Sequence, residues 1–236
     1  MKKTVEIRRF VVVGLLYNIE DKIIKLRSRI ARACTRSCRD LAEVKVIAVT
    51  KNFSSAVVRD AIQCGLRDFG ENRVREVYTK YKELDDIRPL IRLHFIGHLQ
   101  TNKVKDALET VDIIHSIDTL RLAQVINERA AKKAPVLIQV NVTGEETKYG
   151  FSINEIGTAV SQISRMPNIE VLGLMTVAPL VADPQDVRPV FIRLKKLNTS
   201  YGFKELSMGM TDDFEVAIEE GATMVRIGRA IFGERS

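Results

Sequence analysis

Residues 44–53 read Val44-Lys45-Val46-Ile47-Ala48-Val49-Thr50-Lys51-Asn52-Phe53. A mostly apolar run at 44–50 is followed here by Lys51, with no glycine in the residues that come next. A near-continuous apolar run of this length is typical of a parallel strand that helices cover on both faces. An open, doubly wound sheet usually carries a glycine-rich turn after its first strand. The run therefore favours a closed (β/α)8 barrel of the TIM type, with the open sheet as the alternative.

Seven further short apolar runs follow this one, each separated from the next by a stretch that can form a helix or a turn. With residues 44–50 they make eight predicted strands, the others being 66–69, 92–96, 111–115, 136–142, 171–175, 205–208 and 223–227. Helices are predicted from the 3.6-residue spacing of apolar side chains over 17–33, 56–64, 72–84, 101–108, 119–132, 153–166, 184–201 and 212–220. Such alternation implies parallel strands joined by right-handed crossovers. We therefore predict a single α/β domain over residues 17–236, preceded by an extension at 1–16 whose role the sequence does not define.

Composition limits the classes of function. The chain has 236 residues, 45% of them hydrophobic, which is enough for a full core. Its formal net charge is +7, but Lys and Arg are dispersed without a basic run, so we expect no binding to nucleic acid. No apolar run reaches the roughly 20 residues that a membrane span requires. The three cysteines (Cys34, Cys38 and Cys64) indicate a reducing compartment and core packing, with no metal site.

The first residues need separate attention, because basic residues precede a short apolar stretch at 10–16. This order resembles the start of a signal peptide, but the apolar stretch is short and no small-residue cleavage site follows it. We therefore expect a cytoplasmic protein that does not associate with membranes.

Lys51 is the first candidate site residue, since it follows the first predicted strand directly. In a (β/α)8 barrel the loops after the strands converge at one end, and active sites lie there. Partial burial at this mouth favours a neutral amine, the form that attacks an aldehyde to give an imine. The alternative is a lysine whose stem lies along the surface and whose charge is in solvent.

The loops after the seventh and eighth strands supply a second group of candidates. Ser207 and Met208 lie in the first of these loops, and Gly228 and Arg229 in the second. Phosphate sites in barrels are often built at this place from backbone N–H groups and a helix N-terminus. Gly228 would let the backbone approach a phosphate closely, and Ser207 offers a hydroxyl. A lysine on one side and a phosphate site on the other predict a ligand with an aldehyde and a phosphate.

Ten segments between residues 48 and 233 resemble, in order, the YggS/PROSC family of pyridoxal-phosphate homeostasis proteins. They include Ala48-Val49-Thr50-Lys51, Phe69-Gly70-Glu71-Asn72-Arg73, His94-Phe95-Ile96-Gly97-His98, His115-Ser116-Ile117-Asp118, Lys148-Tyr149-Gly150-Phe151, Leu206-Ser207-Met208-Gly209 and Val225-Arg226-Ile227-Gly228-Arg229, and also residues 102–103, 139–141 and 173–176. The resemblance implies an alanine-racemase-like barrel that binds pyridoxal 5′-phosphate (PLP) as a Schiff base on Lys51. One departure concerns the loop after the lysine, where Asn52-Phe53-Ser54 replace the threonine and proline usual in the family.

The resemblance also implies roles for individual residues. The phosphate would lie near Ser207, Gly228 and Arg229, Asn72 would lie near the cofactor, and Arg226 would face the pyridine nitrogen. A guanidinium only donates, so it would keep that nitrogen unprotonated and weaken the cofactor as an electron sink.

The function that we expect is PLP homeostasis, in which the chain binds the cofactor and passes it to apo-enzymes without catalysing a reaction of its own. The alanine racemases have a further β-domain that supplies a catalytic tyrosine, and this chain has no residues for one after its eighth strand. We therefore assign no catalytic residues, and expect His98 and Glu71 to order the loops at the mouth. We expect a monomer. A small PLP-dependent amino-acid racemase is the main alternative, and a Schiff-base aldolase or phosphosugar enzyme without cofactor is another.

Overall fold

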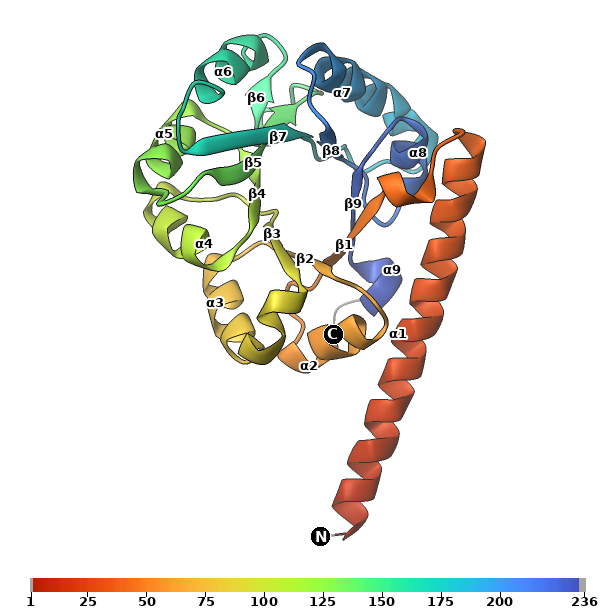
Figure 1. The fold of residues 1–236 in the computed structure, drawn as a ribbon. Helices are drawn as coiled ribbons and strands as arrows, with labels where there is room; N and C mark the ends of the chain where they lie inside the picture. The colour runs from red at the N-terminus through yellow and green to blue at the C-terminus, as the bar shows by residue number, and fades with distance from the viewer. Residues whose placement is uncertain (1, 234–236) are drawn as a thin grey trace.

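The structure, a computed structural model, describes residues 2–233 and the side chains of residues 19–233. Within these residues, eight parallel strands form a closed barrel with helices around it (Figure 1). The barrel strands are β1 (Lys45–Val49), β2 (Asp68–Glu71), β3 (Arg92–Phe95), β4 (Ile113–Ile117), β5 (Ala134–Asn141), β7 (Ile169–Met175), β8 (Glu205–Ser207) and β9 (Met224–Ile227). Neighbours in the sequence pair with each other, and the first strand pairs with the last. The predicted (β/α)8 barrel is therefore confirmed.

The helices follow the strands along the chain and form the outer layer. They are α1 (Lys2–Arg36), α2 (Ser55–Gln63), α3 (Val74–Lys82), α4 (Val104–Thr110), α5 (Leu120–Arg129), α6 (Ile156–Ile163), α7 (Arg188–Ser200), α8 (Phe214–Glu219) and α9 (Arg229–Phe232). A two-residue strand, β6 (Phe151–Ser152), adds to the end of β5 and was not predicted. Short 3₁₀ turns, η1 (Leu41–Glu43), η2 (Asp85–Leu90), η3 (Thr101–Lys103) and η4 (Pro184–Val187), join some of the elements.

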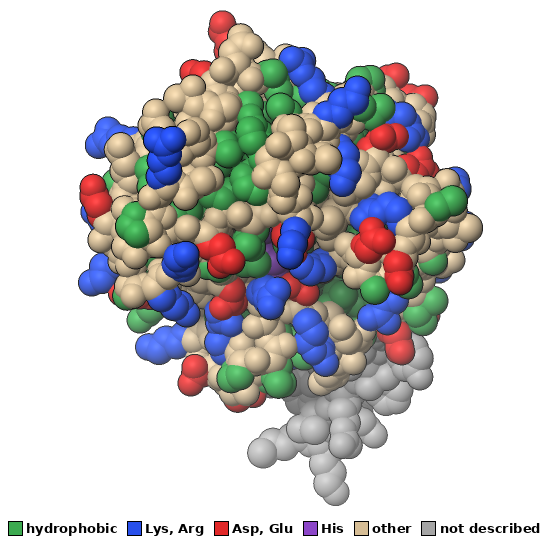
Figure 2. All heavy atoms as spheres, turned by 45° about the horizontal axis from the view of Figure 1, so that its top comes forward, with side chains coloured by type: hydrophobic (Ala, Val, Ile, Leu, Met, Phe, Trp, Pro, Cys, Tyr) green, Lys and Arg blue, Asp and Glu red, His purple; other side chains and the backbone are tan. Residues whose placement is uncertain are grey.

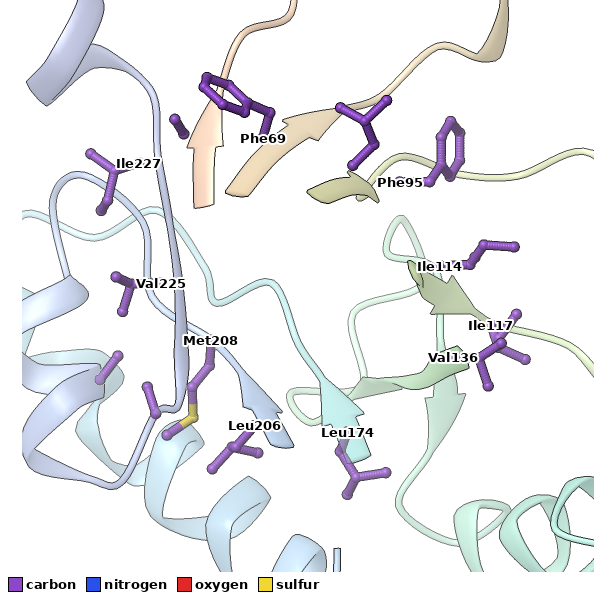
Figure 3. Packing of buried hydrophobic residues seen from close by; sticks show 14 of the residues in the cluster. Phe69, Phe95, Ile114, Ile117, Val136, Leu174, Leu206, Met208, Val225 and Ile227 are labelled. Atoms are coloured by element: carbon purple, nitrogen blue, oxygen red, sulfur yellow. The ribbon is translucent and has the colours of Figure 1, made fainter. Parts of the chain in front are cut away.

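Each barrel strand presents one set of side chains to the helices and the other to the barrel interior. Figure 3 shows Phe69, Phe95, Leu174 and Leu206 pointing away from the ring of strands, into the large core that the helices cover. The alternate residues form a small separate cluster inside the barrel, made of Ile47, Leu137, Met175 and Met224 with Leu172 against it. This alternation decides which side chains can reach a site at the barrel mouth.

Two strands begin two residues later than predicted, and helix ends explain the difference. Leu66 and Val111 were assigned to strands because they are apolar. In the structure the N–H of Leu66 donates to the carbonyl of Ala61 (3.1 Å), and Val111 is the C-cap of α4. Apolar residues just past a helix end commonly pack back onto the last turn. As a result β2 extends to Glu71, which places that carboxylate inside a strand.

Helix α1 covers the junction between the first and last strands. Its apolar residues Ile19, Ile23, Leu26 and Ile30 are all buried, as their spacing predicts. The helix packs against α8, α9 and α2, and Figure 1 shows its N-terminal part extending past the barrel. The boundary predicted at residue 17 falls inside this one helix.

The cysteines and the surface agree in part with the sequence expectations. Cys34 is buried and Cys64 packs against the same core, whereas Cys38 is exposed, with φ +54°, just after α1.

On the face shown in Figure 2, blue basic side chains alternate with red acidic ones instead of forming a patch of one sign. Among residues 2–233, no helix combines the length and the apolar character needed to cross a bilayer.

Candidate cofactor site

Lys51 lies in a tight turn at the carboxyl end of β1. The N–H of Phe53 donates to the carbonyl of Thr50 (3.0 Å), so Lys51 and Asn52 are the two central residues of a β-turn. Asn52 has φ +66°, a conformation that asparagine tolerates better than most residues. The departure from the family pattern at Asn52 is therefore compatible with a tight turn that presents the Lys51 amine at the barrel mouth, where the side chain is half-buried.

Three side chains hold this turn from below. The Thr50 hydroxyl donates to Glu71 Oε1 (2.7 Å), and the Lys80 ammonium donates to the Thr50 carbonyl (2.7 Å). The N–H of Asn52 donates to Glu76 Oε1 (2.5 Å). Lys80 joins the two carboxylates, since it lies 2.7 Å from Glu71 Oε1 and 2.9 Å from Glu76 Oε1. We call these three side chains, Glu71, Glu76 and Lys80, the lysine-turn clamp.

The clamp is deeply buried. The side chains of Lys80 and Glu71 are 6% and 1% exposed, and Glu71 Oε2 has no hydrogen-bond partner. Burial raises the pKa of the Glu71 carboxyl, and the attraction of Lys80 opposes this rise only in part. Burial likewise raises the pKa of the Tyr81 phenol, whose oxygen lies 3.4 Å from the Thr50 hydroxyl. Glu71 is therefore held away from solvent, where its contacts are with the turn and with Lys80.

Arg226 lies on β9, the strand that pairs with β1, and Ser207 lies on the next strand, β8. The guanidinium of Arg226 donates from Nη1 to Ser207 Oγ (2.7 Å) and from Nη2 to the carbonyl of Thr176 (2.7 Å). Arg226 is only 4% exposed, and burial lowers its pKa to about 10, although the carboxylate of Asp213 opposes this. The guanidinium is thus charged at neutral pH, and its hydrogen-bond partners in this part of the structure are neutral oxygens. A buried cation of this kind favours an anion or a lone-pair acceptor beside it.

Two histidines extend the polar contacts of Ser207 into the barrel. His115 Nδ1 lies 3.0 Å from Ser207 Oγ, and His115 Nε2 lies 2.9 Å from His94 Nδ1. His94 Nε2 in turn lies 2.9 Å from Asp68 Oδ1. Both rings are fully buried. Burial, then the neighbouring His94 and Arg226, hold the pKa of His115 well below its usual 6.5, so this imidazole is neutral.

The in-register pairing of β1 with β9 brings the two sides of the site together. Ile47 pairs with Arg226 and Ala48 with Ile227, so Lys51 and the Gly228–Arg229 loop leave the barrel side by side. A Cβ on Gly228 would lie 3.6 Å from Val49 Cβ, which confirms this contact. The ring of Phe53 also packs on Phe232 of α9, with centroids 5.1 Å apart.

The remaining predicted residues differ in what they can offer. The side chain of Met208 is buried in the core outside the barrel, and its N–H already donates to the Met224 carbonyl (3.2 Å). Arg229 pairs with Asp212 at the rim of the mouth. Asn72 is half-buried, and its Oδ1 has no hydrogen-bond partner. Of this group, Asn72 is therefore the one that has a buried polar atom without a hydrogen-bond partner.

Gly97 fixes the position of Asn72. A Cβ at Gly97 would lie 2.3 Å from the Asn72 carbonyl oxygen, which no side chain could relieve because the clash is with backbone. The loops after β2 and β3 thus cross in direct contact. The next residue, His98, donates from Nδ1 to Asp118 Oδ2 (2.7 Å) and stacks on Tyr149, with centroids 4.0 Å apart. These contacts order the loops at the mouth.

The arrangement offers one nucleophile after β1 and a set of hydrogen-bond donors on the two adjoining strands, β9 and β8. Lys51 supplies an amine that can add to a carbonyl carbon. Arg226 and Ser207 supply a cation and a hydroxyl, which suit anionic oxygens or a ring nitrogen lone pair. No group of three or more His, Cys, Asp or Glu side chains among the described residues has the geometry of a metal site. The donor set therefore fits an organic ligand that carries an aldehyde and an acceptor-rich group.

A cleft of about 1190 Å³ lies at the opposite end of the barrel, away from these residues. It is bounded by the first residues of β3, β4, β5 and β7 and by the ends of α4 and α5, including Arg92, Lys105, Arg129 and Lys133. The volume of this cleft does not by itself indicate a functional site. We place the site at the carboxyl end of the strands, because the amine, the buried guanidinium and the converging loops are there.

Sequence reasoning missed three contributors to this site. Lys80 looks like any other lysine of an amphipathic helix, because its role depends on β2 and β1 lying beside α3. His94 and His115 give a weak signal, namely a histidine at an inward position of two neighbouring strands. That signal becomes readable only when the strand phase is known.

The family comparisons agree with this geometry. The model for the alanine racemase N-terminal domain matches residues 25–236. A pyridoxal phosphate homeostasis protein of Aquifex aeolicus is 44% identical over 227 residues, which cover 92% of this chain and 99% of that protein. The protein of that name in Escherichia coli K12 is 36% identical, with 92% and 97% covered.

Solved structures give the same result. PipY of Synechococcus elongatus, with PLP bound, superposes with a TM-score of 0.80 at 31% identity over 91% of this chain and 100% of that one. The alanine racemase of Corynebacterium glutamicum shares the fold at 18% identity, with a TM-score of 0.71, and this chain covers 62% of it. Three findings agree: the barrel is closed by β1 and β9, the family model matches residues 25–236, and the relatives are 36–44% identical. The chain therefore belongs to the alanine racemase N-terminal domain family and, within it, to the YggS/PROSC group of pyridoxal phosphate homeostasis proteins.

Proposed function

We propose that this chain binds PLP as a Schiff base on Lys51 and passes it to apo-enzymes that need it. The observation that carries the proposal is the pairing of β1 with β9, which sets Lys51 beside the Gly228–Arg229 loop and on the strand next to Arg226. The relatives named for PLP homeostasis and the PLP-bound PipY support it.

The donor set fits each part of this cofactor. The neutral Lys51 amine would attack the aldehyde carbon, the aldehyde oxygen would leave as water, and a C=N bond would form. Ser207 and the backbone at Gly228 and Arg229 would bind the phosphate. Asn72 has an unpartnered oxygen at the mouth and would lie near the cofactor. Met208 would contribute only through its backbone, since its side chain is in the outer core.

Arg226 supports binding without catalysis. Its guanidinium is fixed by Ser207 and Thr176 and can only donate a hydrogen bond. Facing the pyridine nitrogen, it would leave that nitrogen unprotonated and so make bound PLP a weaker electron sink. The chain would therefore hold the cofactor in a form of low reactivity until water attacks the C=N carbon and returns the free aldehyde and amine.

An absorption spectrum tests the binding. Purified protein with PLP should show a visible band that borohydride abolishes, because hydride adds to the C=N carbon and leaves a stable secondary amine on Lys51. Mass spectrometry should locate the adduct on the peptide with Lys51. Lys51→Ala should lose the band and the adduct, whereas Lys132→Ala, an exposed lysine far from the mouth, should keep both. A protein that stays colourless with added PLP would overturn the proposal.

A transfer assay tests the second half. Loaded protein is mixed with a PLP-dependent apo-enzyme in the presence of a phosphatase that destroys free PLP. We expect enzyme activity to appear with the wild type and not with Lys51→Ala incubated with the same PLP. Equal activation by both proteins would show that transfer from Lys51 does not occur.

A PLP-dependent racemase is the second candidate, and His98 is the observation that favours it. Asp118 fixes one ring nitrogen of His98 at 2.7 Å, and an imidazole held this way can act as a base through the other nitrogen. Loaded protein in D₂O with L-alanine distinguishes the two functions. Deuterium at Cα that disappears in His98→Gln would establish the racemase, and its absence would favour the carrier.

We further propose that the protein acts as a monomer in the cytoplasm and does not bind nucleic acid. Light scattering after gel filtration checks the first point, since a mass of twice the chain's 26.6 kDa would contradict it. Salt-dependent retention of a nucleic acid duplex would contradict the second.

A further inference from the structure

A single file of hydrogen-bonded side chains crosses the interior of the barrel. It begins at Asp68, the first residue of β2, and passes through His94 on β3 and His115 on β4 to Ser207, the last residue of β8. Arg226 on β9 joins it at Ser207. Every link is between 2.7 and 3.0 Å long. The file therefore connects the amino end of the barrel with the carboxyl end, where Lys51 lies.

The chemistry of the two ends fixes the direction of every hydrogen bond in the file. The Asp68 carboxylate only accepts, so a neutral His94 carries its proton on Nε2. His94 Nδ1 must then accept, which places the proton of His115 on Nε2. His115 Nδ1 must in turn accept, and the proton that it accepts is that of the Ser207 hydroxyl. Arg226 only donates, and it donates to Ser207 Oγ.

One consequence concerns the ligand at the mouth. A serine hydroxyl has one hydrogen, and in this arrangement Ser207 uses it on His115. Ser207 cannot then donate to a phosphate oxygen. Adding one proton to His94 reverses this. His94 would donate from both nitrogens, His115 would carry its proton on Nδ1 and donate to Ser207 Oγ, and the Ser207 hydrogen would be free for the ligand.

We propose that Asp68, His94 and His115 are positioning residues that decide whether the Ser207 hydroxyl donates to His115 or to a phosphate-bearing ligand, and that uptake of one proton by His94 switches between the two. The identity of the ligand in this inference rests on the proposed binding of PLP. The switch itself can be observed in the ligand-free chain and does not depend on that proposal. The low pKa of His115, which is due first to burial, agrees with a neutral His115 in both arrangements.

The proton has a route from solvent. The Asp68 side chain is 23% exposed and borders a cleft of about 360 Å³ at the amino end of the barrel. A proton that arrives there would form a His94–Asp68 ion pair at the existing 2.9 Å contact. One positive charge added inside the barrel also offsets one negative charge of an incoming phosphate, so the two events favour each other.

Other charged groups around the file come from several strands. Lys45 on β1, Arg67 and Arg92 line the same cleft as Asp68. Lys45 is paired with Glu205 on β8 at 2.5 Å, Arg67 donates to the carbonyls of Ile62 and Leu66, and Arg92 is the residue of β3 that pairs with Asp68. Arg226 on β9 faces His115 from the mouth side. The apolar cluster inside the barrel consists of these residues: Ile47, Leu137, Met175 and Met224.

Nitrogen NMR of the histidines tests the switch in the full chain, which has only three histidines. His98→Gln removes the third signal and leaves the file intact. Ligand-free protein at pH 8 should show His115 with its proton on Nε2 and an unprotonated Nδ1. Acidification, or saturating PLP at constant pH, should move that proton to Nδ1 and protonate both nitrogens of His94. A proton already on Nδ1 at pH 8, or one that stays on Nε2 at low pH, would overturn the inference.

Proton counting tests the link to binding. PLP binding is measured by calorimetry in two buffers of different ionisation heat, for the wild type, Asp68→Asn and Glu170→Gln. Glu170 is an exposed acid at the same end of the barrel and serves as the control. We expect the wild type and the control to take up one more proton than Asp68→Asn, which makes their affinity change about tenfold more per pH unit. Equal proton uptake by all three would refute the coupling, whereas a failure of PLP to bind at all would remove the proposed function and leave the NMR result to decide the switch.

Discussion

Replacing Lys80 with methionine should test how the lysine-turn clamp stabilises the protein. Methionine keeps most of the volume of the side chain but leaves the Glu71 and Glu76 carboxylates without their cation, and Glu71 is 1% exposed. Removing one partner of a buried ion pair typically costs about 3–5 kcal/mol, because the other charge stays buried. We therefore expect Lys80→Met to lower the free energy of unfolding by about 3–5 kcal/mol at pH 8. Lys82→Met, on an exposed position of the same helix, should change it by less than about 0.5 kcal/mol.

The loss should depend on pH in a defined direction. Burial raises the pKa of Glu71 above its ordinary 4.5, so the protonated carboxyl is favoured in the folded state. That contribution is fully present below the unfolded pKa and is lost as the pH rises through the folded one. Removing Lys80 takes away the attraction that opposes this rise, so the pKa of Glu71 should be higher still in the variant. The variant should therefore recover stability relative to the wild type as the pH falls from 8 toward 5. Urea unfolding at both pH values gives the two differences. A loss below about 1 kcal/mol at pH 8, or an equal loss at pH 5, would refute the assignment of Lys80 as the cation that neutralises Glu71.

Three other predictions follow from named contacts. Gly97→Ala should destabilise the fold by about 1–3 kcal/mol, because its Cβ would lie 2.3 Å from the Asn72 carbonyl oxygen. Gly157→Ala in α6 should instead stabilise the fold by about 0.5–1 kcal/mol. Thermal unfolding measures both, and a higher melting temperature for Gly97→Ala than for Gly157→Ala would contradict this prediction. His115 has a lowered pKa, so its contribution to the free energy of unfolding is fully present above about pH 6.5. Below that value the contribution is lost by about 1.4 kcal/mol per pH unit. His115→Gln should remove this part of the acid sensitivity, which urea midpoints at several pH values measure. Glu215→Gln should cost less than about 1 kcal/mol and lose its effect in high salt, since its partners on α1 are 40% and 47% exposed; a larger effect that salt leaves unchanged would contradict this.

The fold could be predicted from the sequence because strands that are buried on both faces appear in it as short runs of apolar residues. All eight barrel strands have one, and the absence of glycine after residues 44–50 separated the barrel from an open sheet. The signature failed at Leu66 and Val111, because apolar residues also pack against helix ends. It also stopped short of Glu71, because a carboxylate at the end of a strand looks like the start of a loop.

The site could be predicted in part, because residues at strand ends converge in any barrel. Lys51, Ser207, Arg226 and Gly228 fall into this class, and the structure brings them to one mouth. Met208 shows the limit of the reasoning, since a shift of one residue along a strand turns a side chain to the opposite face. The clamp and the histidine file have no local pattern, because each connects elements that only the closed barrel brings together.

The pairing of the first strand with the last has a consequence for how the protein is made. Lys51 leaves the ribosome before Ser207 and Arg226, which emerge only after the first six barrel strands have been synthesised. Until then β1 lacks the neighbour that closes its edge, and contacts between such distant parts of a chain form late in folding. A nascent or truncated chain would present the lysine without the guanidinium and the hydroxyl opposite it. Retention of the cofactor would therefore mark chains that have been completed and closed.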